Sequence, residues 1–222
     1  MHIGYLSVIL IALVLGLGSQ AWIKRTYSKW SDVPVSSGMT GAEAARRMLD
    51  NNGLYGVGID MIRGELSDNF DPRTNTLHLS QAVYNGRTVS ATAIACHEAG
   101  HAIQHATGYT PIKIRTAIVP VASFASNAWI ILLLIGFFLN MIGLVWAAII
   151  MYACVVLFQL VTLPVEFDAS GRALKTISAT MPLSHEQNEG ASAVLRAAAF
   201  TYVAAALASL LQLLYFVGMA RN

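Results

Sequence analysis

The chain has 222 residues, of which 55% are hydrophobic and only 12% are charged, and its formal net charge is +2. This composition excludes an ordinary soluble domain and favours a membrane protein. The small net charge, with basic residues interspersed among acids, excludes nucleic acid as an expected partner.

Four apolar runs account for the excess of hydrophobic residues. They cover Ile3 to Ile23, Ala117 to Leu139, Met141 to Leu163 and Ala193 to Met219. At about 1.5 Å per residue, each run is long enough to cross a hydrocarbon core of about 30 Å. Their only formal charge is Arg196, near the start of the fourth run. We therefore predict a multi-pass, mainly α-helical membrane protein with four transmembrane helices that contact the lipid bilayer.

Basic residues near the ends of the runs predict the orientation in the membrane. They are Lys24, Arg25 and Lys29 after the first run, and Arg172 and Lys175 after the third. No basic residue precedes the first run, which favours a retained anchor over a cleaved signal peptide. Because basic loops stay in the cytoplasm, we expect residues 24–116 and 164–192 on the cytoplasmic side of a bacterial inner membrane. Both termini are expected on the opposite side.

The predicted organisation has five parts in chain order. They are a transmembrane anchor at 1–23, a cytoplasmic subdomain at 24–116, a transmembrane hairpin at 117–163, a cytoplasmic helical segment at 164–192, and a last transmembrane helix with the C-terminus at 193–222.

The subdomain at 24–116 is expected to be α+β. Thr40 and Glu43 form a capping-box pair at the start of a helix that Gly53 ends. Two extended segments, "LYGVGIDMI" and "TNTLHLS", follow and are separated by the turn formers of "RGELSDNFDPR". The last predicted element is a helix from about Thr88 to Thr107, ended by Gly108.

That last helix contains the sequence HEAGH, from His97 to His101. Histidines at i and i+4 lie about 40° apart around a helix, so both can bind one tetrahedral Zn²⁺ ion. Glu98 projects from the same side and is suited to take a proton from the water that zinc activates. We therefore predict one Zn²⁺ ion on His97 and His101, with Glu98 as the catalytic general base.

A catalytic zinc site needs a third protein ligand and one open position. A metzincin would have a third histidine where this chain has Thr107, so that class is excluded. His105 lies two turns along the helix from the first motif histidine, too far to share its ion. Our predicted third ligand is Glu166, in "LPVEFDASGRA" directly after the third apolar run, presented by the first turn of a helix that starts near Pro164.

Several neighbouring residues have open roles. Asp168 is an alternative ligand, or an acceptor for a histidine N–H, and acids also suit a helix N-terminus without any metal. His185 and Tyr202 are candidate donors to the oxyanion of a tetrahedral intermediate. If "TNTLHLS" is an open edge strand, it can bind an extended peptide, with His78 facing substrate or solvent. Cys96 is expected to be a packing residue in a reducing compartment.

The chain resembles a known family at these residues. HEAGH followed by a distant Glu-Phe-x-Ala is similar to the glutamate-zincin membrane peptidases. The stretches "TGAEAARRML", "LSDNFDPRTNTLHLS" and "LPVEFDASGRAL" together resemble the YugP-type bacterial membrane zinc metallopeptidases. The resemblance extends over roughly residues 35–205, and the phrase around Asp71, Pro72 and Arg73 is more specific than the zinc motif alone.

The resemblance implies a zincin-like subdomain and a particular set of site residues. That set is zinc on His97, His101 and Glu166, with Glu98 as base. In the wider glutamate-zincin pattern an acid follows the third ligand by four residues, but this chain has Ser170 there. The partner of a zinc histidine therefore stays open between Ser170 and Asp168.

We expect a membrane-anchored zinc endopeptidase that hydrolyses peptide or membrane-protein substrates at the cytoplasmic face. One alternative is an intramembrane zinc protease, which would need the motif inside an apolar span and usually an Asp-bearing membrane motif, whereas none of the four runs contains Asp. Another is a non-catalytic membrane protein whose structural zinc has four protein ligands. The amides Asn127, Asn140, Gln159 and Gln212 indicate helix packing more than a transport path.

Overall fold

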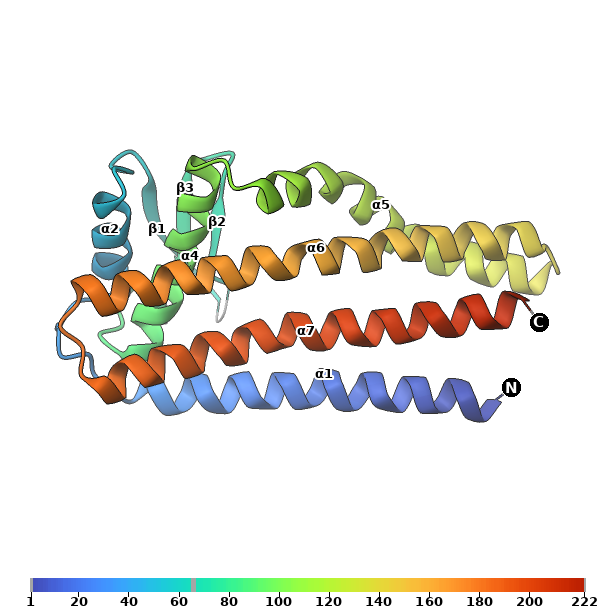
Figure 1. Cartoon of the computed structure of the whole chain (residues 1–222), viewed down its shortest axis with the longest axis horizontal. Coiled ribbons are helices and arrows are strands. Elements are labelled where there is room, and N and C mark those ends of the chain that lie inside the picture. The colour runs from blue at the N-terminus through green and yellow to red at the C-terminus, as the bar shows by residue number, and fades with distance from the viewer. Residues whose placement is uncertain (1, 65–66, 222) are drawn as a thin grey trace. The chain divides into compact units, whose positions relative to one another are not determined.

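The structure of the chain, a computed structural model, describes residues 2–64 and 67–221 (Figure 1). This part of the chain is mainly helical, with one small sheet. The elements are α1 (His2–Ser31), α2 (Gly41–Asn51), β1 (Gly58–Ile62), β2 (Asn69–Asp71), β3 (Thr76–Ser80), α3 (Gln81–Asn85), α4 (Val89–Ala106), α5 (Thr110–Phe138), α6 (Ile142–Thr180) and α7 (His185–Arg221). The predicted fold class, a mainly α membrane protein with a small α+β part, is confirmed.

Four of these helices are long and apolar enough to cross a membrane. They are α1, from Gly4 onward, α5, α6 and α7. Each of them covers one of the four apolar runs seen in the sequence, to within one residue. The predicted number of membrane-spanning helices is therefore confirmed.

Helix α6 differs from the prediction because it does not break near Pro164. The helix has 39 residues and runs through Pro164, which corrects the expectation of a new helix starting there. At 1.5 Å per residue it is about 58 Å long, roughly twice the thickness of a hydrocarbon core. A proline removes one hydrogen bond from the ladder, while the bonds on both sides of it remain to continue the helix. Glu166 therefore lies in the interior of a long helix and not in a first turn.

Helix α7 begins earlier than the apolar run it contains. Ser184 and Gln187 form a reciprocal capping box, in which each backbone N–H donates to the other residue's side-chain oxygen, at 3.1 and 3.2 Å. This S-x-x-Q pattern satisfies two donors that a helix start would leave unpaired. The segment expected at 164–192 is thus the end of α6, a short turn and the first two turns of α7.

The chain forms two compact units, each described here by itself. The first unit covers the described parts of 1–20, 113–164 and 201–222, and the second covers those of 21–112 and 165–200. In the first unit, Tyr152 and Phe216 pack with Trp129, and the Tyr152 hydroxyl donates to Gln212 at 3.1 Å. This amide bonds a neighbouring helix, as isolated amides in membrane helices commonly do. The five-part division of the sequence stays a prediction.

The sheet of the second unit has the strand order β1-β3-β2. β1 pairs with β3 in parallel, and β2 pairs with it in antiparallel fashion. β3 carries the "TNTLHLS" segment and is the central strand, so the expectation that this segment forms an open edge is wrong. The turn-rich stretch before it contributes the three residues of β2, which the sequence analysis did not predict. His78 lies on β3 opposite Asp60 and Asn69.

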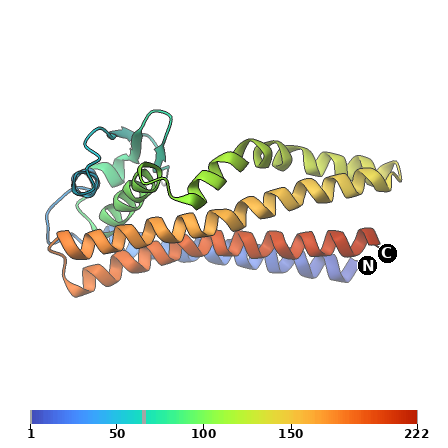
Figure 2. The ribbon, with the colours of Figure 1, turned by 45° about the horizontal axis from the view of Figure 1, so that its top comes forward.

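The motif helix α4, green in Figure 2, lies beside the small sheet. Residues of the core of the second unit hold it in place. Leu77 and Leu79 of β3 are fully buried and belong to the same core as Met48 and Leu49 of α2. The Thr88 side chain caps the start of α4 by accepting a hydrogen bond from the Ala91 N–H at 3.3 Å. Its other end closes at Gly108, whose φ of 65° is a left-handed conformation that glycine adopts without strain. Both predicted ends of the motif helix are therefore confirmed, to within one residue.

Candidate metal centre

The second unit brings together the two histidines of HEAGH and a carboxylate from α6. The His97 Nε2 atom lies 3.2 Å from Glu166 Oε2, and the His101 Nε2 atom lies 3.7 Å from the same oxygen. One ligand atom from each of the three residues can be chosen so that all lie within 4.8 Å of one another. Residues almost seventy positions apart in the sequence thus present three potential metal-ligand atoms at one point.

These separations fit a small divalent cation. Two ligand atoms bound at about 2.1 Å to a tetrahedral ion lie about 3.4 Å apart, close to both measured His–Glu separations. The two imidazole rings are 4.7 Å apart between centroids and nearly perpendicular, at 82°. Imidazole nitrogen together with carboxylate oxygen is a donor set that suits zinc. The residues present therefore fit the zinc ion that the sequence motif predicts.

The three candidate ligands are largely buried, and the remaining ring nitrogens of the two histidines contact other side chains. Glu166 is only 3% exposed and His101 only 9%. The Ser170 hydroxyl lies 3.1 Å from His97 Nδ1, and the Gln104 Oε1 atom lies 3.0 Å from His101 Nδ1. Both Nδ1 atoms therefore contact neighbouring side chains, and the two Nε2 atoms face the Glu166 carboxylate.

Glu98 lies beside this group without being part of it. Its side chain is largely buried, and burial raises the pKa of its carboxyl above the usual range. The two motif histidines oppose this rise, while the carboxylates of Glu166 and Asp68 add to it. Burial also disfavours the charged form of His101, yet its contacts with Glu166 and the charge of Glu98 raise its pKa overall. The charges of Glu98, Glu166 and the two motif histidines are thus close enough to affect the pKa values of Glu98 and His101.

The site requires α4 and α6 to cross closely at one glycine. A Cβ atom added to Gly100 would lie 2.7 Å from the Ala169 carbonyl oxygen and 3.1 Å from its Cα. Real Cβ atoms do not approach backbone atoms so closely, so only glycine fits at this position of HEAGH. Gly100 thereby lets the helix that carries both histidines approach the helix that carries Glu166.

Asp168 and His105, also singled out in the sequence, pair with residues outside the candidate ligand group. Asp168 accepts hydrogen bonds from Gln104 at 2.8 Å and from Arg172 at 2.6 Å. His105 packs beside the ring of Phe70, with 6.0 Å between the ring centroids. The structure therefore answers one open question: Ser170, and not Asp168, contacts the zinc-motif histidine His97.

The remaining candidates are placed as follows. His185 is largely exposed on α7 and pairs with Glu189 at 3.3 Å, and Tyr202 belongs to the first unit. Cys96 is fully buried in the core, and burial raises the pKa of its thiol to about 12, as expected for a packing residue. Gln104 was not identified from the sequence as a site residue, although its position three residues after His101 puts it on the same helical face.

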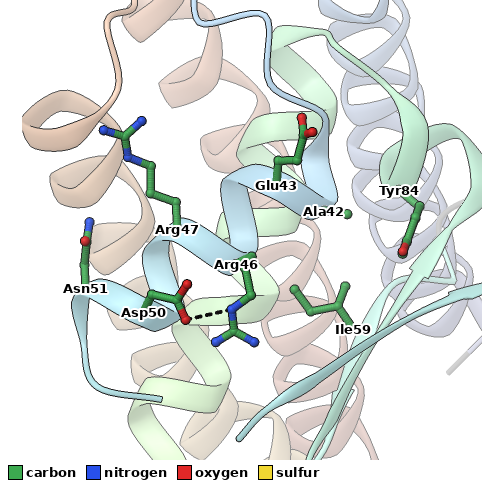
Figure 3. Close-up of a pocket in the computed structure, with 8 residues that line it drawn as sticks. All are labelled: Ala42, Glu43, Arg46, Arg47, Asp50, Asn51, Ile59 and Tyr84. Carbon is green, nitrogen blue, oxygen red and sulfur yellow. Dashed lines mark hydrogen bonds and ion pairs between the residues drawn. The ribbon is translucent and has the colours of Figure 1, made fainter. Parts of the chain in front are cut away.

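A separate hollow is lined by residues of α2 together with Ile59 and Tyr84 (Figure 3). It has a volume of about 700 Å³, and none of the predicted site residues lines it. The Arg46 guanidinium on its wall pairs with Asp50 at 2.8 Å and donates to the carbonyl oxygens of Leu54 and Val57. Arg46 therefore fixes the turn between α2 and β1, and its charge is already satisfied within the protein.

Comparisons with known proteins agree with this chemistry. The sequence profile of a family described as "putative neutral zinc metallopeptidase" matches residues 5–221. The chain is 45% identical over 218 residues to the "putative membrane protease YugP" of Bacillus subtilis (strain 168), and the match covers 98% of this chain and 97% of the relative. No solved structure matches the chain.

The close crossing of α4 and α6 generates a test that leaves every ligand in place. Gly100→Ala should lower the free energy of unfolding by about 1–3 kcal/mol, because the added methyl group forces the two helices apart. Bound zinc should fall with it, since the histidines move away from Glu166. Thermal denaturation in detergent and zinc quantification measure the two effects.

Gly171→Ala on α6 is the matched control, because a Cβ at Gly171 would meet nothing within 4 Å. Alanine is favoured over glycine in a helix by about 1 kcal/mol, so this variant should be as stable as the parent or more so. Equal stability and zinc content in the two variants would contradict the close crossing.

Proposed function

The chain belongs to the neutral zinc metallopeptidase family, and from this premise we propose that it is a membrane-anchored endopeptidase with one zinc ion. In this proposal His97, His101 and Glu166 bind the zinc, and Glu98 is the general base. The observation that carries it is the convergence of both Nε2 atoms on Glu166 Oε2, at 3.2 and 3.7 Å, with Glu98 next to the first histidine.

The ligand count supports a catalytic and not a structural site. Three residues make up the group that can hold a metal in the described part of the chain. A structural zinc site has four protein ligands, whereas three leave a position for water and substrate. When bound, zinc acts as a Lewis acid that polarises the scissile carbonyl and makes water acidic enough to be deprotonated near neutral pH.

The protein residues would then move the proton. Glu98 accepts a proton from the attacking water at its carboxylate and gives it to the nitrogen of the leaving amine. Its burial favours this role, because a raised pKa brings the carboxyl closer to the pH at which it must both take and give a proton. His97 and His101 stay neutral ligands, which is the form that presents a lone pair to a metal.

The cytoplasmic membrane face is our proposed location of the site. Among the described residues, α4 is not one of the helices that are long and apolar enough to cross a membrane. This supports a site beside the bilayer over one inside it. Lys24, Arg25 and Lys29 at the end of the first span, and Lys175 beyond the third, support a cytoplasmic location of both parts of the site.

Exchange of the base should separate catalysis from metal binding. Glu98→Gln keeps the size of the side chain but cannot accept the proton, so kcat/KM on a peptide substrate should fall by about 10²–10⁴. Bound zinc should stay at one ion per chain, because Glu98 is not in the ligand group. Glu189→Gln is the same exchange on an exposed pair of α7 and should change neither quantity. Full turnover by the first variant would remove the proposal.

Exchange of the third ligand should act on the metal first. Glu166→Gln removes a charged ligand from a buried site and should lower both zinc occupancy and activity, as measured after dialysis against a weak chelator. Glu189→Gln again serves as the control. If zinc stays bound and the wild-type protein has no peptidase activity, the structural-zinc alternative gains support.

The proposed orientation can be tested with single cysteines in a variant that carries Cys96→Ala and Cys154→Ala. Tyr55→Cys lies in an exposed turn of the second unit, and Leu139→Cys lies in the connection between α5 and α6. In intact spheroplasts a membrane-impermeant maleimide should label position 139 but not position 55, and both positions after permeabilisation. Labelling of position 55 before permeabilisation would contradict a cytoplasmic site.

A further inference from the structure

The strongest unassigned feature is the fully buried amide of Gln104 between α4 and α6. Its Oε1 atom lies 3.0 Å from His101 Nδ1. Its Nε2 atom donates to the Val165 backbone carbonyl at 2.7 Å and to Asp168 Oδ2 at 2.8 Å. The side chain is 0% exposed, so bulk water does not compete for its hydrogen bonds. All three contacts are thus part of the folded structure of the second unit.

The chemistry of these partners allows one orientation of the amide. A backbone carbonyl and a carboxylate can only accept hydrogen bonds, so the NH₂ group of Gln104 must face them. The amide oxygen therefore faces His101, and it too can only accept. Turning the amide over would place oxygen against oxygen at two contacts and leave buried groups unpaired, at about 1–3 kcal/mol for each.

This orientation dictates where the proton of a neutral His101 resides. Because Gln104 Oε1 can only accept, the Nδ1 atom of His101 must carry the hydrogen. The Nε2 atom then has the free lone pair, and it is the atom that lies 3.7 Å from Glu166 Oε2. The amide thus selects the tautomer that a metal at this point requires.

The Arg172 guanidinium holds Asp168, the last residue in this series of contacts, in place. Arg172 Nε lies 2.6 Å from Asp168 Oδ2, and the Arg172 guanidinium stacks over the ring of Tyr109, 5.7 Å from its centroid. The Asp168 Oδ2 atom accepts hydrogen bonds from both Arg172 and Gln104. Asp168 therefore stays an acceptor, which in turn holds the NH₂ group of Gln104.

The Nδ1 atom of the other histidine has no such constraint. His97 Nδ1 contacts the Ser170 hydroxyl at 3.1 Å, and a hydroxyl can donate or accept by rotating. Ser170 is therefore compatible with either tautomer of His97. The two metal-motif histidines differ in how strongly the protein presets them.

We propose that Gln104 is a positioning residue that presets His101 for metal binding, and that Asp168 and Arg172 hold its amide in the required orientation. The metal named here rests on the proposed function, whereas the tautomer of His101 does not. Loss of such a partner of a metal histidine weakens metal affinity about 10–100-fold.

The first measurement is the zinc affinity of the full-length protein in detergent, by competition with a chelating dye. Gln104→Leu keeps the volume but removes every polar contact and should weaken zinc binding about 10–100-fold. Gln104→Glu keeps an acceptor for His101 but turns a second carboxylate toward Asp168, so it should also bind zinc weakly. Ser170→Ala, on the His97 side, should have a smaller effect than Gln104→Leu.

The rescue variant separates positioning from general packing. Asp168→Asn added to Gln104→Glu provides an NH₂ group that donates to the new carboxylate, with the polarity of the contact reversed. Zinc affinity should recover in part relative to Gln104→Glu alone, because the Val165 carbonyl still faces an oxygen of the new carboxylate. Zinc binding by Gln104→Leu equal to that of the wild type would overturn the proposal.

The second measurement needs neither zinc nor activity. In metal-free protein labelled with ¹⁵N-histidine, at alkaline pH where the imidazole is neutral, His101 should show a single tautomer with hydrogen on Nδ1. Its signal is assigned by its absence in His101→Gln. Gln104→Leu should show a mixture of tautomers. A mixture in the wild type would overturn the inference, whereas a single tautomer in a protein that binds no zinc would refute the proposed function alone.

Discussion

The approach of α4 to α6 is the constraint on which the site depends. Both helices carry candidate metal ligands, and these side chains come together only where the two backbones approach closely. Gly100 permits this, because any side chain there would overlap the Ala169 carbonyl. The buried carboxylate of Glu166 is tolerated because the His97 Nε2 atom lies at hydrogen-bond distance from it. The close packing of α4 against α6 therefore also determines whether the three candidate ligands can bind one ion.

Some of the fold could be predicted because its signals are local. Apolar runs predict spans by length, and a capping box or a glycine marks a helix end within one turn, as at Thr40 and Gly108. The i and i+4 histidines are likewise placed by the geometry of one helix. Its position after a span and the family resemblance both indicate Glu166 as their partner, and the distances in the structure are consistent with it.

Other features could not be predicted because tertiary contacts decide them. The three residues of β2 lie among turn formers and are in a strand only because β3 provides a pairing edge. Pro164 resembles a helix start in sequence, whereas α6 runs through it. The capping box at Ser184 and Gln187, by contrast, is a local S-x-x-Q signal for the start of α7. Gln104 resembles any polar helix residue until its partners on α6 are known.

The contacts of Glu166 with both imidazoles have a consequence for the metal-free protein. Without an ion, the 3.2 Å separation between His97 and Glu166 is that of a hydrogen bond. The three side chains thus hold one another in the arrangement that the ion needs, so little ordering entropy remains to be lost when it arrives. Ion binding would then displace the hydrogen from His97 Nε2 and leave the three side chains close to their present positions.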